Sequence, residues 1–327
     1  MALKTDYKDY IPPSGGRKYK ITANSDGSSS VEDITQYQQV GDTWGAEDIN
    51  QVNKLVNSAV YPNLGTNTNF SNPINQRSAA SYTGDSTSPY CIDRWRISNG
   101  TTYTVGTFTL SAANYANRAC GMWQTNLLGE HWLSIGDNVT VSIYANGQLH
   151  TAVMQVLDRD SYSSFADVPA GYTCDDFEIV LCTYAGDSSK YNLGVYPKKA
   201  LTVNYIKWEK GSVATPYVPK GYGAELSECL RFYYQVASVR TFGQQHTGAG
   251  TYVNIILPQV MRVTPTVSAP GEWTIRFNGT DKKATVSSVG SLNGNTLNLT
   301  MSTIAGGTYI GPLYAFYDGK ITFSADL

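Results

Sequence analysis

The sequence carries little charge for its length. Only 15% of its 327 residues are Asp, Glu, Lys or Arg, against roughly 25% in an average soluble protein. The 24 Lys and Arg nearly balance the 26 Asp and Glu, which leaves a formal net charge of −2. Binding to nucleic acid depends on neutralising phosphates with positive charge. We therefore expect no nucleic-acid partner.

Long apolar runs are missing as well. No stretch approaches the roughly 20 apolar residues that span a bilayer, so we expect no membrane insertion. Residues 1–7, MALKTDY, lack the apolar centre of a secretory signal, which predicts a protein made in a cytosol. The five Cys are widely scattered and form no C-x-x-C pair. They predict reduced thiols rather than disulfides or a zinc site.

Motifs of common enzyme classes are also absent. The three His form no H-x-x-x-H pair, and neither a G-x-S-x-G elbow nor a Walker phosphate loop occurs. Two carboxylate pairs remain, Asp158 with Asp160 and Asp175 with Asp176. A glycosidase needs two carboxyls about 5–9.5 Å apart, whereas Asp158 and Asp160, on one face of a predicted strand, also suit calcium or surface ion pairs. We expect no enzyme activity, no cofactor and no metal.

Tyrosine, glycine and neutral polar residues take the place of charge. The chain has 24 Tyr and 30 Gly, a mixture that suits β-sheets joined by tight turns. Alternating segments separated by turn signals recur along most of the sequence. We predict an all-β protein in three parts, residues 1–60, 61–220 and 221–327.

Residues 1–60 have the pattern of an extended arm. Residues 18–22 and 30–35 predict a hairpin, and Gly45–Val60 predicts an amphipathic helix. The apolar stripe of that helix consists of Ile49, Val52 and Val56. One such helix has no core of its own to cover, so it must dock on a neighbouring domain, on copies of itself or on a larger assembly. We favour a multichain assembly.

The other two parts have the rhythm of β-sandwiches. Short strands with no long helix between them predict two stacked antiparallel sheets over 61–220, most simply a jelly roll. Its expected strands are 103–110, 138–144, 148–157, 177–184 and 200–208. Residues 221–327 predict a smaller β-sandwich that follows a helical stretch at 224–234. Its expected strands are 251–257, 272–277, 283–288, 296–302, 313–317 and 320–324.

Several motifs in residues 1–235 resemble bacteriophage tail-fibre and receptor-binding proteins. The opening of the resembling module runs from Tyr61–Leu64 through Asn69–Arg77 to Ile92–Trp95, its end is Tyr205–Tyr217, and Glu225–Gln235 follows. The resemblance implies a jelly-roll, carbohydrate-binding-like module behind an attachment arm. The last part is similar, at the level of fold alone, to the trimeric lectin-like tips of phage fibres.

This resemblance implies a function and a location. It points to a homotrimer in the virion, at the tail tip or baseplate, with residues 1–60 bound to tail or baseplate proteins. The ligand would be a bacterial cell-surface glycan, held by multivalent, non-catalytic binding. One alternative is a structural baseplate or fibre-linking protein with no glycan site. Another is a polysaccharide depolymerase built on the same frame.

Aromatic and planar polar side chains are the candidate ligand contacts, because sugars stack on aromatic faces. The candidates are Trp123, Trp132, Arg276, Tyr309, Tyr314 and Tyr317, with Tyr162, Tyr172 and Tyr184 in or beside loops and Asn278 and Asp318 at turns. We expect Trp95 and Trp273 to be core residues, Asp93 and Arg94 to form a local ion pair, and His246 to lie in an exposed loop.

Overall fold

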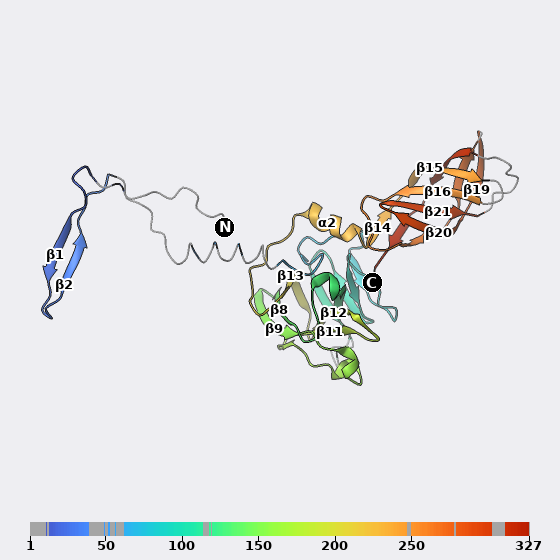
Figure 1. Ribbon diagram of the computed structural model, residues 1–327. Coiled ribbons are helices and arrows are strands. Elements are labelled where there is room, and N and C mark those ends of the chain that lie inside the picture. Colours follow the sequence, from blue (N-terminus) through green and yellow to red (C-terminus); the bar gives the residue numbers. More distant parts are fainter. Residues whose placement is uncertain are drawn as a thin grey trace. The chain divides into compact units, whose positions relative to one another are not determined.

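The computed structural model describes residues 11, 13–38, 49, 52, 56, 62–113, 118, 120–246, 250–277, 279–302 and 311–326. The chain is mostly β, with 49% strand, one short helix, several antiparallel sheets and one curled half-barrel sheet. Two compact units, Met1–Pro62 and Asn63–Leu327, divide the chain (Figure 1). The predominance of β-structure that the sequence predicts is confirmed.

The described part of the first unit contains the expected hairpin. Strands β1 (Tyr19–Ala23) and β2 (Ser29–Asp33) pair antiparallel. The turn between them is held by Asp26, whose carboxylate accepts hydrogen bonds from the backbone N–H and the hydroxyl of Ser28. Of the predicted helix, Ile49, Val52 and Val56 are described and are helical. The other residues of Gly45–Val60 lie outside the described residues.

Two antiparallel sheets form the first part of the second unit. The five-stranded sheet has the order β10 (Tyr172–Thr173), β11 (Phe177–Tyr184), β12 (Asp187–Pro197), β7 (Met122–Leu127) and β4 (Trp95–Ile97). The six-stranded sheet has the order β3 (Ser81–Thr83), β5 (Thr101–Thr104), β6 (Thr109–Ala112), β13 (Leu201–Lys210), β8 (Asn138–Ala145) and β9 (Gln148–Gln155). Inward-facing residues of both sheets belong to one hydrophobic core.

Aromatic side chains occupy the centre of this core. Trp95, expected there from the sequence, is fully buried and meets Trp208 with ring centroids 6.2 Å apart and Phe70 with centroids 5.1 Å apart. The expected strand 103–110 is wrong, because a turn at 105–108 divides it into β5 and β6. The central strand β12 was not predicted.

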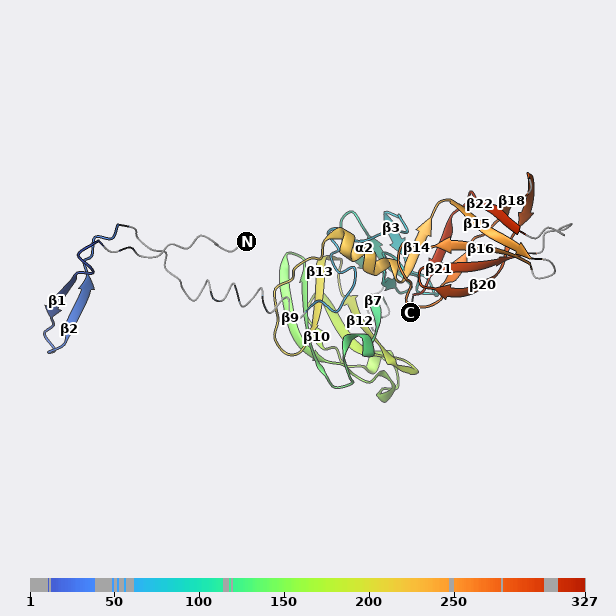
Figure 2. The same ribbon diagram turned by 45° about the horizontal axis from the view of Figure 1, so that its top comes forward.

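The last part of the unit has a core of its own. A three-stranded sheet has the order β14 (Tyr233–Val236), β23 (Ile321–Ser324) and β17 (Thr266–Ser268). A seven-stranded sheet has the order β19 (Thr280–Ala284), β18 (Trp273–Phe277), β22 (Gly311–Tyr317), β15 (Val239–His246), β16 (Gly250–Ile256), β21 (Thr296–Met301) and β20 (Val286–Asn293) (Figure 2). Trp273 and Ile275 are fully buried, as expected. The expected strand 283–288 is wrong, since its residues divide between β19 and β20.

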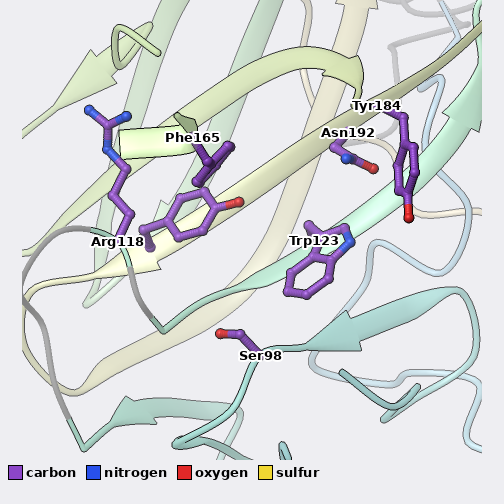
Figure 3. Close-up of a pocket in the computed structure, with 7 residues that line it drawn as sticks. Ser98, Arg118, Trp123, Phe165, Tyr184 and Asn192 are labelled. Atoms are coloured by element: carbon purple, nitrogen blue, oxygen red, sulfur yellow. The ribbon is translucent and has the colours of Figure 1, made fainter. Parts of the chain in front are cut away.

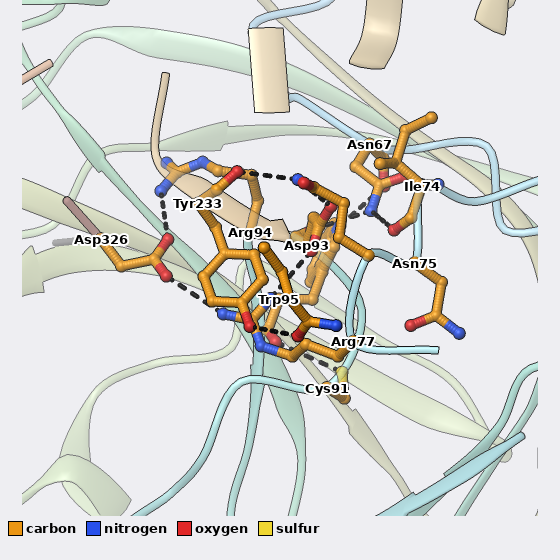
Figure 4. Close-up of polar contacts among 12 residues, drawn as sticks. Asn67, Ile74, Asn75, Arg77, Cys91, Asp93, Arg94, Trp95, Tyr233 and Asp326 are labelled. Carbon is orange, nitrogen blue, oxygen red and sulfur yellow. Dashed lines mark hydrogen bonds and ion pairs between the residues drawn. The ribbon is translucent and has the colours of Figure 1, made fainter. Parts of the chain in front are cut away.

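Helix α2 (Tyr222–Leu230) leads into a buried ionic cluster that joins the two parts. Arg77 places Nη1 2.8 Å from Asp93 Oδ1 and Nη2 3.2 Å from Asp326 Oδ2 (Figure 4). Arg94 has its guanidinium 3.6 Å from the centroid of the Phe232 ring and donates from Nη2 to the Thr125 carbonyl at 2.7 Å. The expected Asp93–Arg94 ion pair is therefore wrong, because Arg77 holds Asp93.

Burial decides the protonation of this cluster. It raises the pKa of Asp93 to about 6, although Arg77 opposes the shift. It also raises the pKa of Asp326 and lowers that of Arg94. Folded Asp93 binds its proton more tightly than the unfolded side chain, whose pKa is 3.8. This carboxyl therefore favours the fold at low pH, and that contribution is lost as the pH rises through about 6.

We predict that Arg77→Met destabilises the protein more at pH 8 than at pH 5. At pH 8 the variant leaves a buried carboxylate without its cation, a change that typically costs about 3–5 kcal/mol. At pH 5 Asp93 is protonated and the loss is smaller. Denaturant unfolding at both pH values measures the difference. Arg276→Met is the control, since the Arg276–Asp281 pair is exposed. A loss in Arg77→Met that is equal at pH 5 and pH 8 would contradict the prediction.

A second group of hydrogen-bonded side chains lies in the core between the five-stranded and six-stranded sheets. Trp208 Nε1 donates to the Tyr191 hydroxyl at 3.0 Å, and that hydroxyl lies 2.5 Å from His131 Nδ1. The Tyr191 hydroxyl accepts from Trp208 and can donate to His131 when Nδ1 of the neutral imidazole carries no proton. Burial lowers the pKa of His131 to about 4.

We predict that His131 makes the fold sensitive to acid. Unfolded His131 takes up a proton near pH 6.5, whereas the folded side chain does so only near pH 4. Stability is therefore lost as the pH falls through this window, by at most about 1.4 kcal/mol per pH unit. The measurement is the unfolding free energy of the native chain minus that of His131→Asn between pH 4 and 7. A difference that does not change with pH would refute this assignment.

Candidate ligand-binding pocket

The outer face of the five-stranded sheet carries the site. Alternation along β12 sends Tyr191, Leu193 and Val195 into the core, so that Asn192 and Tyr196 lie on the opposite face with Gly194 between them. Gly194 pairs with Trp123 of β7 on one side and with Val180 of β11 on the other. Trp123, Gly194 and Val180 thus form a row across three neighbouring strands, and its middle position has no side chain.

Gly194 leaves a hollow that the ring of Tyr196 partly fills. A Cβ atom at position 194 would lie 2.5 Å from the Tyr196 hydroxyl oxygen and 2.7–2.8 Å from its ring. A Cβ at Gly121 would also collide with this ring. Tyr196 is only 8% exposed, and burial raises the pKa of its phenol. Its ring lies flat on the sheet as a neutral, fixed floor.

Aromatic rings from other elements form the walls. Phe165 begins the short helix η4 (Phe165–Asp167), which is held by a capping box between Ser164 and Asp167. Its ring centroid lies 5.4 Å from that of Tyr196. The pocket has a volume of about 240 Å³ and is lined by Ser98, Arg118, Trp123, Phe165, Tyr184, Asn192 and Tyr196 (Figure 3).

The polar groups that line the pocket include the amide of Asn192 and the guanidinium of Arg118. Asn192 Oδ1 accepts from the Thr125 hydroxyl at 2.7 Å, and no described residue accepts a hydrogen bond from its Nδ2. Arg118 donates to Glu178 and to the Val168 carbonyl, so its guanidinium is paired within the chain. The pocket thus combines aromatic faces, a free amide donor and a phenol, which suits a neutral polyhydroxyl ligand.

Two residues singled out in the sequence lie in this pocket. Trp123 forms one wall and Tyr184, 39% exposed, forms another. Trp132 lies elsewhere, 83% exposed just after the short helix η2 (Gly129–His131). Tyr162 packs against the buried cluster that contains Val180 and Tyr196, and Tyr172 lies against His150.

The candidates in the last part of the chain do not gather in one hollow. Arg276 forms an exposed ion pair with Asp281, and Tyr314 lies beside it across β18 and β22. Tyr317 is 5% exposed and stacks on Trp273, so it is a core residue. Asp318 forms an ion pair with Arg240. Tyr309 and Asn278 lie outside the described residues. The expectation that His246 lies in a loop is wrong, because it is the last residue of β15; its side chain lies outside the description.

The carboxylate pairs serve local structure. Asp158 accepts hydrogen bonds from the Asp160 backbone and the Ser161 hydroxyl at the start of the short helix η3 (Arg159–Ser161). The expectation that Asp158 and Asp160 share a strand face is wrong, because the chain is in η3 and not in a strand. Asp176 accepts from Asn146 and Lys199. Among the described residues no group of three or more His, Cys, Asp or Glu is placed to hold a metal.

Sequence reasoning missed Phe165, Arg118, Ser98, Asn192 and Tyr196. The one local signal was the alternation in residues 191–196, YNLGVY, where a glycine stands between two polar residues on one strand face. Which strands flank Gly194 depends on the sheet order.

Comparison with known proteins found no similar sequence or structure. No protein-family model, curated protein or solved structure matches the chain. Within the described ranges, no helix has the length and apolar character needed to cross a bilayer.

We predict that Gly194→Ala destabilises the protein by about 1–3 kcal/mol, the usual cost of overpacking a well-filled site. The added methyl group collides with the ring of Tyr196, which cannot move away because it already lies against the backbone at Gly121. Thermal and denaturant unfolding measure the loss. In a Tyr196→Ala background, Gly194→Ala should lose most of its destabilising effect. Gly106→Ala is the control and should be neutral, because a Cβ at that position meets open space. Equal losses with and without the Tyr196 ring would contradict the geometry.

Proposed function

We propose that the chain is a bacteriophage receptor-binding protein of the tail tip or baseplate. It attaches the virion to bacterial cell-surface glycans by binding them without breaking bonds. The observation that carries this proposal is the pocket at Gly194, with its aromatic walls and its one lining cation, Arg118, held by Glu178. The motifs of residues 61–235 that resemble phage receptor-binding proteins support the biological context.

The pocket has the chemistry that a sugar ring requires. A pyranose presents a C–H face, which packs on an aromatic ring, and a rim of hydroxyl groups, which need planar donors and acceptors. Trp123 and Tyr184 supply the aromatic faces, and Asn192 Nδ2 supplies the donor. Most of the ligand contacts are therefore short-range and insensitive to charge, which agrees with the low charge of the whole sequence.

The proposal assigns a role to each part of the chain. Residues 61–220 are a jelly-roll, carbohydrate-binding-like domain, and residues 221–327 are a smaller β-sandwich tip. Residues 1–60 attach the chain to tail or baseplate proteins, with Ile49, Val52 and Val56 as the contact stripe. Three copies bind one repetitive polymer, which multiplies a weak single-site affinity. The protein is made in the bacterial cytoplasm and acts in the virion.

A non-catalytic role agrees with the positions of the carboxylates. Of the residues that line the pocket, none is Asp or Glu. The nearby Glu178 is engaged by Arg118 and Lys198. Hydrolysis of a glycosidic bond needs an acid and a second carboxylate on opposite sides of that bond.

We predict that Trp123→Ala weakens binding to oligosaccharides from the host surface by about 30-fold, or roughly 2 kcal/mol, as for a hot-spot aromatic residue. Calorimetric titration with fragments that occupy one site measures this effect without avidity. Trp123→Phe keeps an aromatic face and should retain most of the affinity.

Tyr222→Ala is the matched control, because Tyr222 is an exposed aromatic residue of α2 outside the pocket. Unchanged affinity in Trp123→Ala would exclude this pocket as the site. A loss in Trp132→Ala alone would move the site to that exposed ring. Release of reducing sugar from the polysaccharide would favour a depolymerase instead.

A further inference from the structure

The β1–β2 hairpin presents an uncovered apolar face. Ile21 and Val31 stand directly opposite each other in the register, and they are 71% and 63% exposed. Tyr19, on the same face, is 51% exposed. The other face has Lys20 opposite Glu32. An isolated two-stranded hairpin is marginally stable in water and needs further strands or a packing partner.

Both edges of this hairpin are open to such a partner. Within the described part of the chain the sheet contains β1 and β2 alone, and every residue of both strands is exposed. Each outer edge therefore offers a row of backbone N–H and C=O groups, which is a template for pairing with another strand.

The two edges differ in the sign of their charge. The β1 side carries Arg17, Lys18 and Lys20, and the β2 side carries Glu32 and Asp33. Among the described residues, neither Lys20 nor Glu32 forms an ion pair. The basic β1 edge of one copy is therefore complementary in charge to the acidic β2 edge of a neighbouring copy.

We propose that this hairpin is a self-association surface. The β1 edge of one copy pairs with the β2 edge of the next, and the Tyr19–Ile21–Val31 faces of the copies pack together. A head-to-tail contact of this kind repeats around a rotation axis and closes into a ring. The inference rests on the multicopy assembly in the proposed function, and it names the surface through which copies meet.

Charge reversal in the full-length chain tests this pairing. Light scattering and native mass spectrometry at micromolar concentration should show an oligomer for the native chain. Lys20→Glu puts a negative charge where the next copy presents Glu32, and Glu32→Lys puts a positive charge where the next copy presents Lys20. Each variant alone should therefore associate about tenfold more weakly or worse, because like charges meet at these positions. Lys282→Glu, a charge reversal at an exposed position of β19, is the control and should associate normally.

Mixing the two variants separates contacts between copies from contacts within one hairpin. Each variant has like charges at positions 20 and 32 of its own hairpin, whereas in a mixture position 20 of one variant and position 32 of the other carry opposite charges. The mixture should therefore regain mixed oligomers. A monomeric native chain, association unaffected by either reversal, or a mixture that stays dissociated would overturn the proposal. Glycan titration of the dissociated variants measures the pocket separately, so either proposal can fail alone.

Discussion

The alternation of side chains along the central strand β12 is the constraint on which the site depends. One set of its residues, Tyr191, Leu193 and Val195, fills the core between the two sheets. The other set, Asn192, Gly194 and Tyr196, faces outward and forms the floor and a polar corner of the pocket. Any shift of register by one residue would exchange the two sets. The same packing that stabilises the domain thus fixes the geometry of the pocket.

Charge is scarce on this chain, and part of it is buried at one junction. Arg77 and Arg94 of the two-sheet part meet Asp326 near the end of the chain, and Arg77 also holds Asp93. Leaving one of these groups unpaired is costly, so the cluster is expected to hold the adjoining segments in one arrangement. A protein that transmits attachment forces would benefit from such a junction, whereas exposed surface pairs such as Arg276–Asp281 would contribute little.

Sequence patterns predicted the elements whose signal is local. The strand over 177–184 was predicted with its observed bounds. Trp95 and Trp273 were correctly placed in cores, Trp273 from the alternation along its strand. Neighbouring residues were a poor guide to contacts: Asp93 and Arg94 lie side by side in sequence, but Arg94 has a positive φ of 72° and has other partners. Trp123 and Tyr184 were recognised as candidates, while Phe165 and Tyr196 join them only through the order of β11, β12 and β7.

The most direct test of the account is to observe Trp123 while a ligand binds. Fluorine NMR of the chain labelled with fluorotryptophan gives one signal for each of its six Trp, and Trp123→Phe assigns the signal of interest. Titration with oligosaccharides from the host surface should shift the Trp123 signal in a saturable way and leave the buried Trp95, Trp208 and Trp273 signals in place. A saturable shift at other tryptophans with Trp123 unmoved would contradict the account.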